Sequence, residues 1–173
     1  YRGASRYIED DQVFQLELQA IKEVREKHGF KNLWMMIPFV RTVKQLEDVK
    51  HIVAESGLRR GPNFQLWMMV EIPSNVIMLD KFIEAGIDGV SIGSNDLTML
   101  ILGVDRDNSR VADVYDERNE AVLWALEKTI KTCKKYGISC SICGQAPSTY
   151  PDLSKKLVEW GVTSVSVSPD AID

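Results

Sequence analysis

The chain alternates short apolar runs with segments in which apolar residues recur at helical spacing. Five apolar runs predict β-strands, and each run ends at a proline, a glycine or a polar residue. The first two are almost wholly apolar, which is typical of strands buried on both faces. The predicted strands cover 33–37, 65–70, 89–92, 138–143 and 162–167.

The segments between these runs predict helices, and a glycine follows most of them, as is common at helix ends. The most regular one has apolar or small residues from Val122 to Cys133 at the spacing of one helix face, and Gly137 ends it. Residues 1–6 are a polar start, and 103–118 are a long polar connection. The other predicted helices cover 11–28, 42–56, 75–85 and 151–160.

This strand–helix alternation predicts an α/β protein with a parallel sheet, either doubly wound or closed into a barrel. No Gly-x-Gly-x-x-Gly follows the first strand, which disfavours a dinucleotide-binding sheet. Polar residues at three strand ends favour a (β/α)8 barrel, in which such residues form the active site. A closed barrel has eight strands. We therefore expect residues 1–173 to be the later part of a barrel domain, with about three strands upstream.

Two of these strand ends carry acids, Glu71 and Asp96. Two carboxylates, completed by substrate oxygens and water, are a usual set of ligands for Mg²⁺. The alternative is that Glu71 is only a charged strand terminus and Asp96 a turn or helix cap. An unpaired acid is costly in the apolar segment 68–73, so a metal or ligand role is favoured for Glu71.

The third strand end carries Cys143, in the sequence Cys140-Ser-Ile-Cys143. Such a pair can be half of a zinc site, but the two histidines, His28 and His51, fall on predicted helices far along the chain. A redox motif should open a helix, whereas this pair ends a strand. Side chains three apart on a strand point to opposite faces. We interpret Cys140 as core, and Cys143 either as a general acid or base or as a small buried hydrophobe.

Arg2 and Arg106 are candidate anion contacts because each adjoins a motif at a predicted strand end and arginine matches carboxylate and phosphate. The alternative for both is an ordinary solvated surface arginine. Trp34 and Trp67 occupy matching places in two predicted strands and are interpreted as core.

Composition narrows the classes of function. The chain has 173 residues, 45% of them hydrophobic, and a net charge of −4. Charges of both signs are interspersed, so neither nucleic acid nor a membrane surface is an expected partner. No apolar run approaches the roughly 20 residues that span a bilayer. Three cysteines fit a reducing compartment, and we expect a cytoplasmic protein.

Six motifs follow one another along essentially the whole chain. They are RGASRYI at 2–8, VEIPSN at 70–75, GSNDLT at 93–98, DRD at 105–107, DERN at 116–119 and CGQAPS at 143–148. Together, and in this order, they resemble the C-terminal domain of the phosphoenolpyruvate synthases (pyruvate, water dikinases). Three shorter forms, Glu-Ile-Pro, Asn-Asp-Leu-Thr and Cys-Gly, are shared with pyruvate phosphate dikinase and with enzyme I of the sugar phosphotransferase system, which are the alternatives.

The resemblance implies a (β/α)8 barrel that binds pyruvate and phosphoenolpyruvate. It implies that Glu71 and Asp96 hold Mg²⁺, and that Cys143 handles the methyl proton of pyruvate. A phosphoryl group would come from a phosphohistidine domain of the same full-length chain, and the barrel domains would pair as a homodimer. The substrate contacts implied by the resemblance are Arg2, Glu71, Ser94, Asn95, Asp96 and Arg106.

The sequence departs from the family at Met99, where glutamine is usual. It also lacks the ATP-binding and phosphohistidine domains, so we expect this chain alone not to complete the dikinase cycle. A non-catalytic dimerisation or scaffold module is the competing hypothesis.

Overall fold

The computed structural model describes residues 1–105 and 107–172. Its strands are β1 (Met35–Ile37), β2 (Leu66–Val70), β3 (Gly89–Gly93), β4 (Ser139–Cys143) and β5 (Ser164–Val165). Its α-helices are α1 (Ala4–Glu9), α2 (Asp11–Glu26), α3 (Val43–Glu55), α4 (Pro73–Ile77), α5 (Leu79–Glu84), α6 (Ser94–Leu102), α7 (Glu120–Tyr136), α8 (Ala146–Thr149) and α9 (Pro151–Trp160). Two short 3-10 helices, Ala112–Val114 and Pro169–Ala171, complete the described elements.

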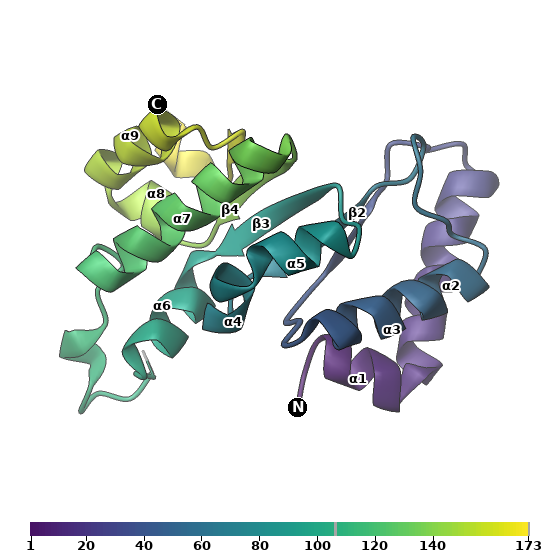
Figure 1. Cartoon of the computed structure of the whole chain (residues 1–173), viewed down its shortest axis with the longest axis horizontal. Coiled ribbons are helices and arrows are strands. Elements are labelled where there is room, and N and C mark those ends of the chain that lie inside the picture. The colour runs from purple at the N-terminus through teal and green to yellow at the C-terminus, as the bar shows by residue number, and fades with distance from the viewer. Residues whose placement is uncertain (106, 173) are drawn as a thin grey trace.

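The five strands form one parallel sheet in chain order, β1-β2-β3-β4-β5. The α/β class and all five predicted strands are confirmed. A doubly wound sheet reverses its strand order part-way, and this sheet does not. Helices α3, α5, α7 and α9 contact one another in succession and accompany the sheet along its length (Figure 1). This arrangement is consistent with part of a (β/α) barrel.

The two faces of the sheet differ in burial. Along β2 and β4, alternate side chains are fully buried against the helices, and those between them are only half-buried. On the face away from the helices, Trp34 stacks on Trp67 with ring centroids 6.5 Å apart. Trp34 is nevertheless 44% exposed and Met36 42% exposed. The prediction that β1 is buried on both faces and that Trp34 is core is therefore wrong, because the described helices cover only one face.

Local signals explain where the main helices begin and end. The Thr42 hydroxyl accepts the Gln45 N–H at the start of α3, and the Asn119 side chain accepts the Ala121 N–H at the start of α7. Gly137 ends α7 in the left-handed conformation. Three short helices were not predicted, α1, α6 and α8. The predicted helix at 75–85 is divided at Met78 into α4 and α5.

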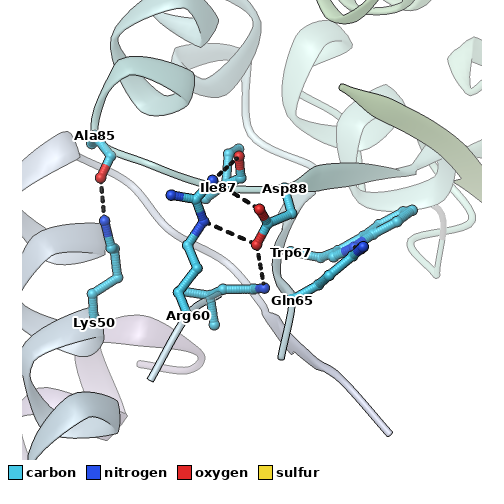
Figure 2. Close-up of polar contacts among 8 residues, drawn as sticks. Lys50, Arg60, Gln65, Trp67, Ala85, Ile87 and Asp88 are labelled. Atoms are coloured by element: carbon cyan, nitrogen blue, oxygen red, sulfur yellow. Dashed lines mark hydrogen bonds and ion pairs between the residues drawn. The ribbon is translucent and has the colours of Figure 1, made fainter. Parts of the chain in front are cut away.

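Opposite the carboxyl ends of the strands, a polar network joins the loops before β2 and β3 (Figure 2). Arg60 makes two hydrogen bonds to the Asp88 carboxylate, at 2.8 and 2.9 Å. Asp88 also accepts the Leu66 N–H at 2.8 Å. Beside it, the Lys50 ammonium donates to the Ala85 carbonyl, and burial followed by the Arg60 charge lowers the pKa of Lys50. Among the described residues, no helix is long and apolar enough to cross a membrane.

Candidate functional site

The register of the central strands brings predicted site residues together at one edge of the sheet. Gly93 pairs with Cys143 across β3 and β4, and Val70 pairs with Ile92 across β2 and β3. Glu71 follows Val70 and so lies beside Gly93. Glu71, Gly93 and Cys143 form one row at the carboxyl ends of three adjacent strands, which we call the Glu71 row.

Gly93 makes this row possible because it has no side chain. A Cβ at Gly93 would lie 2.9 Å from Glu71 Oε2 and 3.0 Å from the Met69 Cε, closer than side chains pack. Any larger residue would therefore displace the Glu71 carboxylate. A glycine at the end of a strand is the expected device where another group must approach the backbone.

The Glu71 carboxyl is buried and held by the neighbouring loop. It is 6% exposed, and its Oε1 accepts the Phe39 N–H at 2.6 Å. Burial raises the pKa of Glu71; the Phe39 hydrogen bond opposes this rise, the Asp96 charge adds to it, and the Arg2 charge opposes it. The acid thus lies in a site where a bound cation would replace lost solvation.

Asp96 reaches the same edge from the first turn of α6, which begins directly after β3. Its Oδ1 accepts a hydrogen bond from Arg2 Nη2 at 2.5 Å. The Arg2 guanidinium in turn lies over the Phe39 ring, 4.0 Å from its centroid. This edge of the sheet therefore brings together four residues that are far apart in sequence: Arg2, Phe39, Glu71 and Asp96.

Cys143 ends β4 and is half-buried. Its thiol donates to the Ile92 carbonyl, and its Sγ accepts the Ser91 hydroxyl, each at 3.5 Å. Cys140 is buried in the core, where contact with Cys133 and then burial raise its pKa. The prediction that Cys140 belongs to the core is confirmed, and the Cys143 thiol is the one at the sheet edge.

Ser94 and Asn95 support the loop that follows β4. The Ser94 hydroxyl is fully buried and donates to Glu117 Oε1 at 2.8 Å, so it is directed into the protein. The Asn95 Oδ1 accepts the Gln145 N–H at 3.3 Å. A Cβ at Gly144 would come within 2.3 Å of the Ser94 Oγ, so this loop also depends on a glycine. Arg106 lies outside the described residues.

The two acids of this edge each have one oxygen left for a ligand. Oε1 of Glu71 and Oδ1 of Asp96 are each engaged by one donor, and within 1–105 and 107–172 their second oxygens have no hydrogen-bond partner. Two carboxylates, with substrate oxygens and water, suit Mg²⁺. The same ranges contain no group of three or more His, Cys, Asp or Glu that could hold a metal without a substrate, as a structural zinc site would need.

Four residues of this site were not singled out by sequence reasoning. Phe39 and Arg41 lie in the loop after β1, where no acid or thiol marks the end of the strand. Asn75 is fully buried and holds the end of β2. Glu117 is 4% exposed and accepts a hydrogen bond from Ser94. The only sequence feature that could have indicated Glu117 is its place as an acid in the motif 116–119.

Two acids, an arginine and a thiol lie at the carboxyl ends of the strands of a parallel sheet, the edge where α/β barrels carry their functional residues. The chain belongs to the family of PEP-utilising enzymes, because the model of their PEP-binding domain matches residues 1–173. It is 51% identical to a probable phosphoenolpyruvate synthase of Staphylothermus marinus and 51% identical to a phosphoenolpyruvate synthase of Aeropyrum pernix. It is 46% identical to a phosphoenolpyruvate synthase of Escherichia coli.

Each of these similarities covers 99% of this chain. The chain in turn spans 21–22% of the length of these relatives. It therefore corresponds to about a fifth of a phosphoenolpyruvate synthase.

Proposed function

We propose that this chain is the pyruvate- and phosphoenolpyruvate-binding part of a phosphoenolpyruvate synthase. The whole enzyme would convert ATP, pyruvate and water to AMP, phosphoenolpyruvate and phosphate, and this part would pass a phosphoryl group from a phosphohistidine on another domain to the pyruvate enolate. The observation that carries the proposal is the Glu71 row with Asp96 and Arg2 beside it, in a chain whose family binds phosphoenolpyruvate.

The roles follow from the chemistry of the side chains. The Arg2 guanidinium would bind the phosphoryl group or the enolate, and Asn95 and Arg106 would add polar contacts to the substrate. Glu71 and Asp96 would hold Mg²⁺. When bound, the ion would supply positive charge that stabilises the enolate. Ser94 would support the site without contacting the substrate, because its hydrogen bond to Glu117 fixes the first turn of α6.

Cys143 would exchange the proton. Towards phosphoenolpyruvate, its thiolate takes a proton from the pyruvate methyl group, and the electron pair left behind forms the enolate. The enolate oxygen then bonds to phosphorus as the bond from phosphorus to the histidine nitrogen breaks. In the reverse direction the thiol returns the proton to the methylene carbon. The half-buried position of Cys143 at the edge of the sheet supports this role.

The test is calorimetric titration with Mg²⁺ and oxalate, which mimics the pyruvate enolate. We expect saturable binding to this chain and at least a tenfold loss of affinity in Asp96→Ala, because one of two metal carboxylates is removed. Asp152→Ala is the control, since Asp152 is an exposed acid in the first turn of another helix, α9.

Circular dichroism of each variant ensures that loss of binding is not loss of fold. A folded wild-type chain that binds no oxalate in the presence of Mg²⁺ would contradict the proposal, as would equal affinity in wild type and Asp96→Ala.

We also propose that the domain pairs with a second copy of itself, which the apolar surface of α4, α6 and α7 supports. Ile77 is 72% exposed and Trp124 59% exposed. They border a hollow of about 400 Å³, and large exposed apolar patches mark interaction surfaces. The hollow is lined by Pro73, Val76, Ile77, Ile101, Ala121, Trp124 and Ala125.

Light scattering tests this pairing. We expect a dimer mass for wild type and a monomer mass for Trp124→Glu, because a charge would then be buried in the interface. Leu16→Glu, at an exposed apolar position of α2, is the control and should remain dimeric. A monomeric wild type at all concentrations would rule this pairing out.

A further inference from the structure

Phe39 has a backbone conformation that bulky residues rarely adopt. Its φ is +50°, and among the described residues it is the only non-glycine with a positive φ. Strained backbone of this kind persists where surrounding contacts enforce it, and it is concentrated at functional sites. Phe39 also follows Pro38 directly after β1, at the same edge of the sheet as the Glu71 row.

Two contacts connect Phe39 to the two halves of the site. Its backbone N–H donates to Glu71 Oε1 at 2.6 Å, which is the one hydrogen bond that this carboxylate makes to the described residues. Its ring lies under the Arg2 guanidinium, 4.0 Å from the ring centroid. The same guanidinium binds Asp96.

The backbone around Arg2 is packed against Phe39 as well. The Ala4 N–H donates to the Pro38 carbonyl at 3.1 Å. A Cβ at Gly3 would lie 2.5 Å from the Phe39 Cβ, so the glycine allows the two segments to touch. The Arg41 guanidinium also lies over the Phe39 ring, at 4.7 Å, and donates to Ser5 Oγ.

The ring is needed because the ion pair alone would not hold Arg2 in place. The Arg2 side chain is 55% exposed, and exposed ion pairs fix long side chains weakly. A guanidinium over an aromatic face gains a further attraction and loses rotational freedom.

We propose that Phe39 is a positioning residue of this site: its ring holds the Arg2 guanidinium ready for the anionic ligand, and its backbone N–H orients the Glu71 carboxylate. The identity of that ligand rests on the proposed function. The position of Arg2 does not, because it can be measured without ligand.

The test separates the ring from the backbone. Phe39→Leu removes the aromatic face and keeps the N–H, whereas Phe39→Tyr keeps both. We expect oxalate, titrated with Mn²⁺ present, to bind about 3- to 30-fold more weakly to Phe39→Leu. Affinity for Mn²⁺ alone, measured by water proton relaxation, should change less than about twofold, because Glu71 keeps its donor. Phe39→Tyr should bind oxalate as tightly as wild type does.

A double-mutant cycle with Arg2→Gln tests whether Phe39 acts through Arg2. We expect Phe39→Leu to have little further effect once Arg2 is replaced, whereas a general structural defect would add to the Arg2 effect. Phe30→Leu, at an exposed phenylalanine in the loop after α2, is the matched control.

A ligand-free measurement keeps this inference distinct from the proposed function. The Arg2 Nε–H proton should show an upfield ring-current shift that disappears in Phe39→Leu. An unshifted Arg2 proton, or equal oxalate affinity in wild type and Phe39→Leu, would overturn the inference. A shifted proton in a wild-type chain that binds no oxalate would support the positioning of Arg2 and reject the proposed ligand.

Discussion

At the scale of single residues, the most informative group is the Glu71 carboxyl. It is almost fully buried, one oxygen accepts the Phe39 N–H, and its pKa is raised chiefly by burial. Ionising it therefore costs more in the folded chain than in the unfolded chain. In the proposed site, a divalent cation beside Glu71 would offset that cost, so metal binding and protonation of this carboxyl would compete.

This coupling predicts a pH dependence of stability. Because the pKa of Glu71 is higher in the folded chain, folding takes up a proton between the ordinary glutamate pKa and the raised value. The stabilisation is complete below the ordinary value and is lost as pH rises through the folded value. Urea unfolding from about pH 4 to about pH 8 should show Glu71→Gln gaining stability relative to wild type as pH rises.

Two comparisons accompany this experiment. Glu159→Gln, at an exposed position of α9, should run parallel to wild type at all pH values. Saturating Mg²⁺ should reduce the wild-type dependence, because the metal competes with the proton. Parallel curves for Glu71→Gln and wild type would contradict the assignment.

The sequence alone identified residues with a reactive or charged side chain at the end of an apolar strand. An acid inside an apolar strand end and a thiol after a strand are visible as Glu71 and Cys143. Phe39 was missed because phenylalanine in an apolar run is ordinary, and only the backbone angle and two contacts reveal its position. Glu117 was missed because its partner, Ser94, lies in a different motif and meets it only in the folded chain.

At the scale of elements, the loops at the functional edge are joined by one side chain. Asn75, in α4, is fully buried. Its Nδ2 donates to the Val40 carbonyl at 2.6 Å, and its Oδ1 accepts the N–H groups of Glu71 and Ile72 at 3.3 and 3.1 Å. The loop after β1 and the end of β2 are thus held together by three hydrogen bonds of one buried side chain.

Removing this amide should destabilise the chain. Asn75→Ala removes the partner of three backbone groups, two of them buried, and we expect a loss of about 2–4 kcal/mol in the free energy of unfolding, measured by urea denaturation. Oxalate affinity should fall as well, because Glu71 loses its anchor. Asn63→Ala, at an exposed position, should stay within about 0.5 kcal/mol of wild type. Equal stability of the two variants would disprove this account.

The strands were predictable from the sequence because each is an apolar run with a clear stop. The short helices α1 and α8 were not, since six and four residues are too few to repeat an apolar pattern over several turns. The polar segment after β3 was interpreted as a turn or a site, and in fact opens α6, so Asp96 projects from a helix rather than from a loop. Tertiary contacts determine these segments more than local pattern does.

At the scale of the whole molecule, the two edges of the sheet differ in what they contribute. The carboxyl ends of the strands carry Glu71 and Cys143, with Asp96 in the helix just beyond. The opposite edge carries the network of Arg60, Asp88 and Lys50 (Figure 2), where the charges bind one another and the backbone. In α/β barrels the same division places chemistry at one edge and stability at the other.

A variant at the second edge tests this division. Asp88→Asn weakens the paired hydrogen bonds to Arg60, and we expect a loss of about 1–2 kcal/mol in the free energy of unfolding. Oxalate affinity should change less than about twofold, since the site lies across the sheet. Asp48→Asn, which breaks the exposed pair with Lys44, should cost less than about 0.5 kcal/mol. A large loss of affinity in Asp88→Asn would show that the edges are not independent.

The sequence separation of the site's contacts has a consequence for biosynthesis. The Arg2–Asp96 pair joins residues 94 apart, and the Ser91–Cys143 contact joins residues 52 apart. Contacts of such long range form slowly, after local helices and neighbouring strand–helix units. On the ribosome, the earlier strands can pair while the chain is still growing, but the Glu71 row cannot exist until β4 has emerged and paired with β3. A nascent chain that stops short of Cys143 would fold most of the helix layer and still lack the thiol at the edge of its sheet.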